Sequence, residues 1–559
     1  MRKSLIAQSV AAMIGGLGLV GAASAAVVGP AGGPDVDGVP AATVLQVNTD
    51  GLGHINVVPY YSVQNGNDTY INITNTDTRN GKAVKVRFRG ASNSDDVFDF
   101  TLLMSPGDIW AAAITKGADG LPVLVTNDKS CTLPNDISGA SFVTARLNPA
   151  WTDEKKATEA SEGYVEILNM ADIPPVSTTD KSSLFESIKH VSGVPRDCAS
   201  GAVADLFDDS GSYADALDKG LEVPTTGLMT NWTVINVAKA AAFTGAATAV
   251  EARETAGGAA GYGNIVLSPQ AATPVTAADA RLWTSDPLLR GGLADNTGTD
   301  GTPGTPAVSA AQYDFPDLST PYLNLDLGAL LFGDATRRQA TALTQALAVT
   351  SVANEYVTDP SILAKTDWIF SMPTRRYNVA RNYAGGTPAG TGANVFTNLQ
   401  YADDDADIGG VNFFTNANTS TTAGQICVTG ISVAAGSTTG VGNRTGAVTG
   451  DREERFVGSS TEFVISPGVP TAPLSFCGEV SVLSFNAAGE TSVLGATVAK
   501  KDLTVAYTDG WVRIATPGLA PGIGLPIIGS AVTEIVNSAV AEGTAGNFGQ
   551  TFPHRATRP

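Results

Sequence analysis

The densest group of carboxylates in this 559-residue sequence lies at 403–407, where four of the five residues are aspartate. Like charges this close repel one another unless water or a cation lies between them. Ca²⁺ takes six to eight oxygen ligands, and carboxylates suit it well. The EF-hand pattern is absent, because Ile408 occupies the position of the turn glycine and Phe414 that of the bidentate glutamate. The run predicts an irregular calcium site, with a plain solvated acidic loop as the alternative. The predicted ligands are Asp403, Asp404, Asp405 and Asp407.

Side chains typical of catalysis are scarce. Histidine, the commonest general base and metal ligand near neutral pH, occurs only as His54, His190 and His554. The zinc-protease, serine-hydrolase and P-loop motifs are absent. Carboxylates are numerous enough for a glycosidase pair, but nothing singles out an acid and a base. We therefore expect no enzyme and no organic cofactor, and keep a secreted hydrolase as the least favoured alternative.

The tryptophans test a second alternative, an exported module that binds glycans or another ligand. Such a module would need several aromatic side chains on one exposed face. Four of the six tryptophans lie in strand-like segments, where packing in the core is the better prediction. These four are Trp110, Trp232, Trp368 and Trp511.

The four cysteines, Cys131, Cys198, Cys427 and Cys477, are widely spaced and form no C-x-x-C motif. This spacing argues against a zinc site, whereas an even number of cysteines in an oxidising compartment indicates disulfides. Pairing of nearest neighbours would give one bond in each half of the chain. Three connectivities and four buried thiols remain open at this stage.

The N-terminus has the pattern of a secretory signal peptide. Arg2 and Lys3 precede an apolar stretch at 5–20, and Ala23-Ser24-Ala25 is a small-residue cleavage site. We expect residues 1–25 to be removed and the chain to act at the cell surface or outside the cell, with the periplasm as the alternative. No later apolar stretch approaches the roughly 20 residues of a membrane-spanning helix, so no transmembrane segment is expected.

The overall charge is strongly acidic, with 34 basic and 54 acidic residues and a net charge of −20. Nucleic acids and anionic lipid surfaces attract basic proteins, so neither is an expected partner. Only 16% of the residues are charged, unlike the highly charged composition of disordered tails.

Alternation of apolar and polar residues predicts strands at 70–73, 84–88, 97–100, 164–168 and 232–237. Turn dipeptides at Asn65-Gly66 and Asn80-Gly81 separate some of these strands. Short helices are expected at 182–191 and 202–217. Further strands are expected at 366–373, 480–485, 503–507 and 511–514.

A helical pattern begins at Asp334, a candidate N-cap, and ends near Asn354. The sequence thus predicts a mainly β protein with two antiparallel, immunoglobulin-like β-sandwich regions and a short helical insert. The expected divisions are a signal peptide (1–25), an N-terminal sandwich with a small helical insertion (26–270), an Ala/Thr/Pro/Gly-rich linker (271–312), a helix-containing connector (313–385) and a C-terminal β domain (386–559).

Several short blocks resemble segments of the surface-layer-like "cell surface protein" family of Gram-negative bacteria, mainly proteobacteria. VRFRG at 86–90, DVFDF at 96–100 and SPGDIW at 105–110 carry the resemblance. The segments 354–356, 366–368, 373–376, 451–454 and 524–529 are similar to other recurring blocks of that family. The resemblance covers most of the chain after the signal peptide, and none of its blocks is a catalytic signature.

The resemblance implies a structural envelope protein whose copies assemble into a layer, with calcium stabilising the assembly. The expected partners are therefore further copies of the same chain and, as the anchor, lipopolysaccharide of the outer membrane. Exposed sheet edges would provide lattice contacts. Because the chain is acidic, cations would be needed where subunits meet.

Overall fold

A computed structural model gives the structure of the chain. It describes residues 27–30, 33–175, 183–207, 212–266, 316–320, 322–323, 332–381, 383, 391, 394–396, 413–431, 448–450, 474–485, 491–503, 508–516, 523–541 and 544–559.

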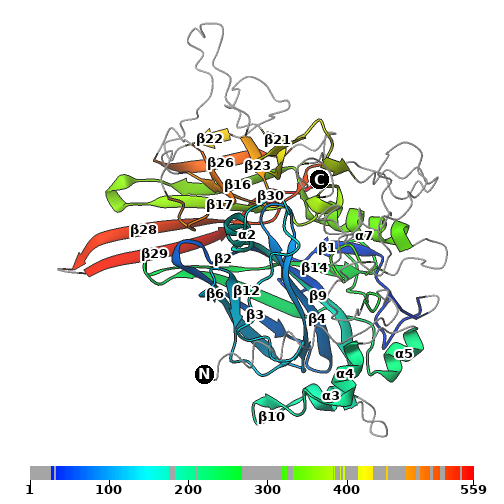
Figure 1. Cartoon of the computed structure of the whole chain (residues 1–559). Coiled ribbons are helices and arrows are strands. Elements are labelled where there is room, and N and C mark those ends of the chain that lie inside the picture. The colour runs from blue at the N-terminus through cyan, green and yellow to red at the C-terminus, as the bar shows by residue number, and fades with distance from the viewer. Residues whose placement is uncertain are drawn as a thin grey trace.

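Two sheets form an N-terminal sandwich (Figure 1). The larger sheet has the order β1-β14-β2-β9-β4-β5-β8 and the smaller β13-β12-β3-β6-β7. The larger sheet comprises β1 (Val44–Val47), β14 (Thr248–Arg253), β2 (Ile55–Ser62), β9 (Glu162–Ile173), β4 (Gly81–Gly90), β5 (Asp96–Met104) and β8 (Cys131–Leu133). The smaller comprises β13 (Ala241–Ala246), β12 (Leu228–Asn236), β3 (Asn67–Asn75), β6 (Ile109–Lys116) and β7 (Pro122–Val125).

The burial of the strands follows from their places in the two layers. Strand β12 alternates between buried and half-buried residues, as expected where one face meets the core and the other approaches solvent. Strands β4 and β9 are buried along their whole lengths. These central strands are therefore covered on both faces.

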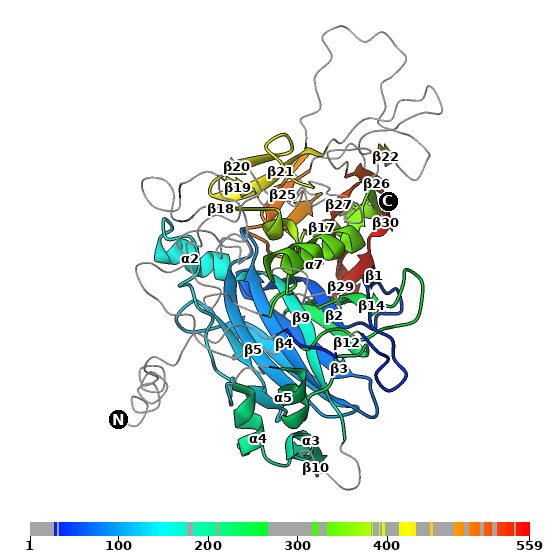
Figure 2. The ribbon, with the colours of Figure 1, turned by 90° about the vertical axis from the view of Figure 1, so that its right-hand side faces the viewer.

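Short helices lie around this sandwich. A small insertion contains α3 (Ser183–Ile188), β10 (His190–Val191), β11 (Val194–Pro195), α4 (Gly201–Ala204), η2 (Asp205–Phe207) and α5 (Tyr213–Asp218). It covers the lower end of the sandwich in Figure 2, in the region where the sequence predicts short helices. Helix α2 (Asp153–Ala160), which the sequence analysis missed, begins at the N-cap Thr152, whose hydroxyl accepts from Lys155 N. A single 3₁₀ turn, η1 (Gln64–Gly66), links β2 to β3.

The second part of the chain is also built from sheets. The main sheet, in the order β25-β24-β17-β28-β29, contains β25 (Lys500–Asp502), β24 (Val480–Ser484), β17 (Lys365–Ser371), β28 (Ser530–Ala541) and β29 (Thr544–Pro553). A second sheet contains β22 (Val448–Gly450), β26 (Asp509–Ala515), β16 (Ser351–Val357) and β30 (Arg555–Thr557). Smaller groups are β20 (Thr419–Thr422), β21 (Gln425–Ile431) and β23 (Leu474–Cys477), the pair β15 (Ala348–Val349) and β27 (Leu525–Pro526), and the pair β18 (Val379–Arg381) and β19 (Asn394–Phe396). Two 3₁₀ turns, η5 (Pro360–Ile362) and η6 (Arg375–Tyr377), flank β17.

The predicted fold class is confirmed, because the described chain is mainly β and its sheets are antiparallel apart from the parallel pair β24–β25. The long helix α7 spans Phe332–Leu347. It therefore begins before Asp334, which is not its N-cap. It also ends seven residues before Asn354, because the chain enters β15 at Ala348 and then pairs with β26 and β30 through β16.

The two parts of the chain share a hydrophobic core. The larger core cluster includes Leu343 and Leu347 of α7, Ile369 of β17 and Val532 of β28 together with the N-terminal sandwich. Figure 2 shows α7 lying between the N-terminal sandwich and the C-terminal sheets. A second cluster fills the C-terminal part, with Trp368 and Phe370 among its members. In the described part of the chain, no helix is long and apolar enough to cross a membrane.

Candidate functional site

The predicted calcium ligands Asp403, Asp404, Asp405 and Asp407 lie outside the described residues. Among the residues that the structure does describe, no group of three or more His, Cys, Asp or Glu side chains is arranged to hold a metal ion. The acidic run therefore stays a sequence-based prediction.

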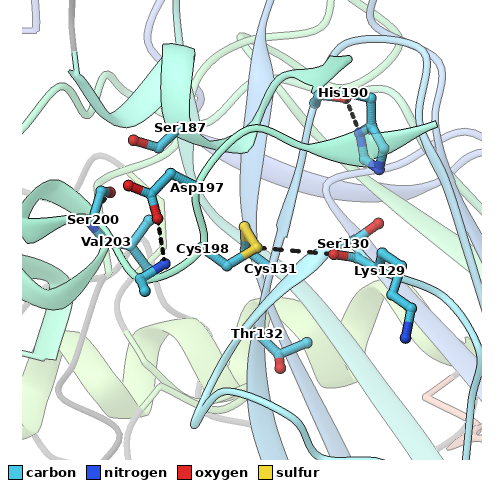
Figure 3. The surroundings of a disulfide bond; sticks show 12 residues. Lys129, Ser130, Cys131, Thr132, Ser187, His190, Asp197, Cys198, Ser200 and Val203 are labelled. Carbon is cyan, nitrogen blue, oxygen red and sulfur yellow. Dashed lines mark hydrogen bonds between the residues drawn. A yellow bond between two sulfur atoms is a disulfide. The ribbon is translucent and has the colours of Figure 1, made fainter. Parts of the chain in front are cut away.

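Both disulfides of the nearest-neighbour pairing are present, Cys131–Cys198 and Cys427–Cys477. The first fastens the helical insertion to β8 at the edge of the large sheet, close to Lys129 and Ser130 (Figure 3). The second joins directly opposed residues of β21 and β23. The bonds join residues 67 and 50 positions apart in the sequence, and such closed loops restrict the unfolded chain.

The histidines are held by structural contacts. His54 is fully buried, with Nε2 2.9 Å from Gly261 O and Nδ1 accepting from Ala252 N at 3.1 Å. Burial lowers its pKa to about 3, and burial likewise lowers the pKa of His554 to about 4. His190 lies against Ser105, 3.0 Å from its hydroxyl.

Three of the tryptophans predicted to be core residues, Trp110, Trp232 and Trp368, are buried, which confirms the prediction. The prediction is wrong for Trp511, which is 36% exposed. Trp511 lies in β26 and pairs with Glu355 and Gly450, in a four-stranded sheet at the outer side of the protein.

A buried charge cluster, which no pattern in the sequence predicted, joins the two parts of the chain. We define it as Arg89 of β4, Glu166 of β9, Asp317 and Arg376 of η6. Arg376 Nη2 lies 3.2 Å from Glu166 Oε1 and 3.1 Å from Asp317 Oδ2. Arg89 Nε lies 3.3 Å from Glu166 Oε2. Their side chains are at most 4% exposed.

The charges of this cluster depend on one another. Burial by itself would raise the pKa of Asp317, but the guanidinium groups of Arg376 and Arg89 outweigh it and hold that pKa below its usual value. Burial also opposes the charge of Arg376, and the neighbouring Tyr377, Glu166 and Asp317 nonetheless raise the pKa of Arg376. Each arginine lies close to both carboxylates, so removing one member would leave an unbalanced buried charge.

A second ionic contact lies next to this cluster. Arg375 pairs with Glu479 through Nε, and its two terminal nitrogens donate to Ile426 O at 3.0 Å and to Ser92 O at 3.2 Å. Glu479 also accepts from the backbone N–H of Arg376 at 2.8 Å. One guanidinium group thus connects η6, β21 and the N-terminal sandwich. The sequence signal for these sites was faint: arginines alternate with apolar residues in a segment that becomes a fully buried strand.

A third bridge between the two parts is the buried carboxyl group of Glu162. It accepts from Thr497 N at 2.6 Å, Thr497 Oγ1 at 3.0 Å and Ala499 N at 3.2 Å. Burial raises the pKa of Glu162 to about 7, although these hydrogen bonds act in the opposite direction.

Glu162 gives folding a pH dependence with a definite sign. Between pH 4.5 and about 7 the carboxyl group of Glu162 is protonated in the folded chain and ionised in the unfolded chain. Its contribution to stability is therefore complete below pH 4.5 and is lost as the pH rises through 7. We expect this loss to reach about 3 kcal/mol. Denaturant titrations at pH 5 and pH 8 measure the free energy of unfolding. Its decrease between the two pH values should be smaller in Glu162→Gln than in the unmodified protein.

The comparison with Glu162→Gln also removes the effect of the buried histidines. The lowered pKa values of His54 and His554 give contributions that are lost as the pH falls, which is the opposite sign. Both histidines are present in both proteins, so their effects cancel in the difference. Equal pH dependence in the two proteins would contradict the role assigned to Glu162.

The outermost described feature is the hairpin of β28 and β29, which extends beyond the body of the protein at the left of Figure 1. Strand β29 is the edge strand of its sheet. Phe548, Gln550 and Phe552 share one face of β29, because side chains alternate along a strand. Phe548 is 55% exposed and Phe552 is 43% exposed.

This exposed face continues the C-terminal core outward. In the sheet register Trp368 lies opposite Ala531, and Ala531 lies opposite Phe552. Phe548 lies opposite Ile535 in the same hairpin. The row thus begins at the completely buried Trp368 and ends at the exposed Phe552, and Phe548 lies four residues away on the same face of β29. We call Ile535, Phe548 and Phe552 the hairpin face.

The opposite face of the hairpin is fixed against the N-terminal sandwich. Asn547 donates a hydrogen bond to Lys239 O, and Glu534 accepts from Asn547 at 3.0 Å. Gly549 lies so close to β13 that a Cβ atom there would be 2.3 Å from Ala242 O. The hairpin is therefore braced on one face and exposes apolar side chains on the other.

The fold and these contacts define a mainly β protein with two disulfides, whose two parts are joined by a shared core and by buried ionic contacts. Comparisons with protein-family models, with curated proteins and with solved structures find no match to this chain.

Proposed function

We propose that this protein is a structural subunit of the cell surface whose copies associate laterally into a layer stabilised by calcium. The observation that carries the proposal is the hairpin face, with Phe548 and Phe552 both exposed on the same face of an edge strand. Exposed edge strands and grouped apolar side chains favour association with another chain. A second copy is the expected occupant, because a layer requires contacts between identical subunits.

The bracing of the body supports the same function. Strand β13 packs against the hairpin, and the two parts of the chain are fastened by buried contacts such as the ion pair Arg376–Glu166 and the hydrogen bond from Arg375 to Ser92 O. A lattice contact transmits load only if the surface that makes it is rigidly attached. Pre-ordered contact surfaces also lose less conformational entropy when they associate.

The charge of the chain supports a role for calcium. Each copy carries a formal net charge of −20, so neighbouring copies repel one another at low ionic strength. Divalent cations bound at the run 403–407 would reduce this repulsion and could bridge subunits. Export to the cell surface, which the sequence pattern of residues 1–25 predicts, would provide the millimolar-range calcium that weak extracellular sites require.

Charge reversal of the hairpin face provides the test. We expect the protein without its signal peptide to form ordered arrays or large oligomers with calcium, observed by negative-stain electron microscopy and sedimentation velocity. The double variant Phe548→Lys, Phe552→Lys should associate at least about tenfold more weakly, because two apolar contacts are lost and like charges meet. A calcium chelator should disperse the arrays of the unmodified protein.

Val191→Lys is the matched control, because Val191 is a similarly exposed apolar residue, 47% accessible, on the β10–β11 hairpin at the other end of the protein. This variant should assemble normally. A dispersed monomer that does not respond to calcium would contradict the proposal. Unchanged assembly of the double lysine variant would show that the hairpin face is not the contact.

A further inference from the structure

A buried polar triad joins the two central strands of the large sheet. Lys82 lies in β4, and Asn169 and Asp172 lie in β9. Their side chains are at most 1% exposed. The register shifts between Ala83 and Val84, so that Lys82 lies opposite Asp172 while Val84 lies opposite Asn169. This bulge places two residues that are three apart in β9 beside the same lysine.

The lysine and the asparagine share two acceptor atoms. Asp172 Oδ1 accepts from Lys82 Nζ at 2.9 Å and from Asn169 Nδ2 at 2.8 Å. The carbonyl oxygen of Thr225 accepts from the same two nitrogens, at 3.2 Å and 2.9 Å. The Thr225 hydroxyl donates to the other oxygen of Asp172 and so fixes that carboxyl group. An amine and an amide are thereby held side by side, with a carboxyl group between them.

The orientation of the Asn169 amide follows from its partners. Both contacts of Nδ2 are to acceptors, so the nitrogen must be on that side. Asn169 Oδ1 is buried and has no hydrogen-bond partner. The amide oxygen of Asn169 therefore lacks a hydrogen bond in the interior, where an unpaired polar atom is costly.

Other titratable groups face this site. Asp77 Oδ2 lies 3.9 Å from Lys82 Nζ, and its other oxygen accepts from the backbone of Arg79 and Asn80. His54 and Tyr322 are fully buried, and their rings pack edge to face. Burial and the charge of Lys82 lower the pKa of His54, and burial and the charge of Asp172 raise the pKa of Tyr322, as expected for rings near the triad. Water is therefore largely excluded from the side chains of Lys82, Asn169 and Asp172.

We propose that Lys82 and Asn169 become joined by an intramolecular amide bond between Nζ and Cγ, with Asp172 as the proton carrier. Asp172 takes a proton from the lysine ammonium group, which leaves a neutral amine. Nζ then attacks Cγ of Asn169 and a tetrahedral intermediate forms. Asp172 returns its proton to Nδ2 while the second proton of the amine also passes to this leaving group. The Cγ–Nδ2 bond breaks, ammonium leaves, and Asp172 is again ionised.

The step balances without an oxidant, a metal or a nucleotide. One ammonium group and one primary amide become one secondary amide and one ammonium ion. The product no longer contains a charged lysine in the interior, which removes a desolvation cost. Proximity favours the reaction, because the nucleophile and the amide are held against common acceptors before it begins. The new bond would tie β4 to β9 across 87 residues of chain and so restrict the unfolded state.

Mass spectrometry of a tryptic digest of the exported full chain tests the proposal directly. Trypsin does not cleave after an acylated lysine, so residues 80–85 should remain whole and be joined to residues 157–181. The linked species should have the summed mass of the two peptides less one ammonia. Separate peptides 80–82 and 157–181 at full mass would overturn the proposal and leave a simple ion pair. Loss of water instead of ammonia would overturn the assignment of Asn169 and identify Asp172 as the acyl group.

Variants distinguish the proposed amide bond between Lys82 and Asn169 from a simple ion pair between Lys82 and Asp172. Lys82→Arg keeps the positive charge but cannot form the amide, so the linked peptide should disappear and the melting temperature should fall. Lys85→Arg, in the same strand, is the matched control. Its tryptic digest should still contain residues 80–85 joined to residues 157–181. Asp172→Asn retains Lys82 and Asn169 but should lose the link, because the proton carrier is gone. A link that persists in Asp172→Asn would overturn the role of this residue.

Discussion

Replacement of Arg376 with methionine is expected to lower the free energy of unfolding by about 3–5 kcal/mol. The side chain of Arg376 is 1% exposed and contacts the carboxylates of Glu166 and Asp317 at once. Methionine restores much of the volume but none of the charge. Asp317 would lose the largest of the three guanidinium interactions that now keep its pKa low. Guanidinium chloride unfolding, followed by circular dichroism, measures the change.

The matched control is Arg79→Met, because Arg79 forms an exposed ion pair with Asp37 at 3.0 Å. Exposed pairs of this kind contribute little, so the change should stay below about 1 kcal/mol. The double variant Arg376→Met, Asp317→Asn should recover part of the loss, since one of the stranded charges is removed as well. Equal stability of Arg376→Met and Arg79→Met would show that the buried charge cluster does not hold the two parts together.

Local sequence patterns were sufficient to predict the fold class. The alternating stretch at 70–73 lies in β3, that at 84–88 in β4 and that at 164–168 in β9. Alternation can be read from neighbouring residues alone and indicates a strand, but it did not show that β4 and β9 are covered on both faces. The pairing Cys131–Cys198 likewise follows the order of the cysteines along the chain.

The contacts between the two parts could not be predicted in this way. Arg376 reaches Glu166 across 210 residues of sequence, and Glu162 reaches Ala499 across 337. Such contacts depend on how the sheets are placed, which no local pattern encodes. The end of α7 was misjudged for a related reason. Residues 348–354 are compatible with a helix, but pairing of Val349 with Leu525 and of Ser351 with Ala515 draws the chain into strands.

The hairpin face also depends on tertiary structure. Phe548 and Phe552 have the spacing of a core-facing strand, and nothing local distinguishes them from Trp368 or Phe370. They are exposed because β29 is the edge strand and the hairpin continues past the sheets beside it. A pattern that normally indicates a core here marks a surface, which is why the same residues serve as the proposed contact between subunits.

Trp368 is the buried counterpart of these exposed aromatic residues, and its replacement is expected to have the second large effect on stability. Replacement of Trp368 with alanine should lower the free energy of unfolding by about 3–5 kcal/mol. Its ring packs on Phe485, Phe370 and His554 with centroid distances of 4.8, 6.2 and 5.3 Å. Its indole nitrogen donates to Glu355 O at 3.0 Å. Alanine would leave a cavity in the second core and would remove the hydrogen bond to Glu355 O.

Trp511→Ala provides the control with the same change of side chain, since Trp511 is 36% exposed in a strand at the outer side of the protein. Its replacement should cost no more than about 1.5 kcal/mol, because less apolar surface returns to water and the neighbouring chain can close the gap. Urea unfolding of both variants at pH 7 measures the difference. If the two losses were equal, the row that runs from Trp368 to the hairpin face would not be anchored in the core. The hairpin would then lack the rigid attachment that a load-bearing contact between subunits needs.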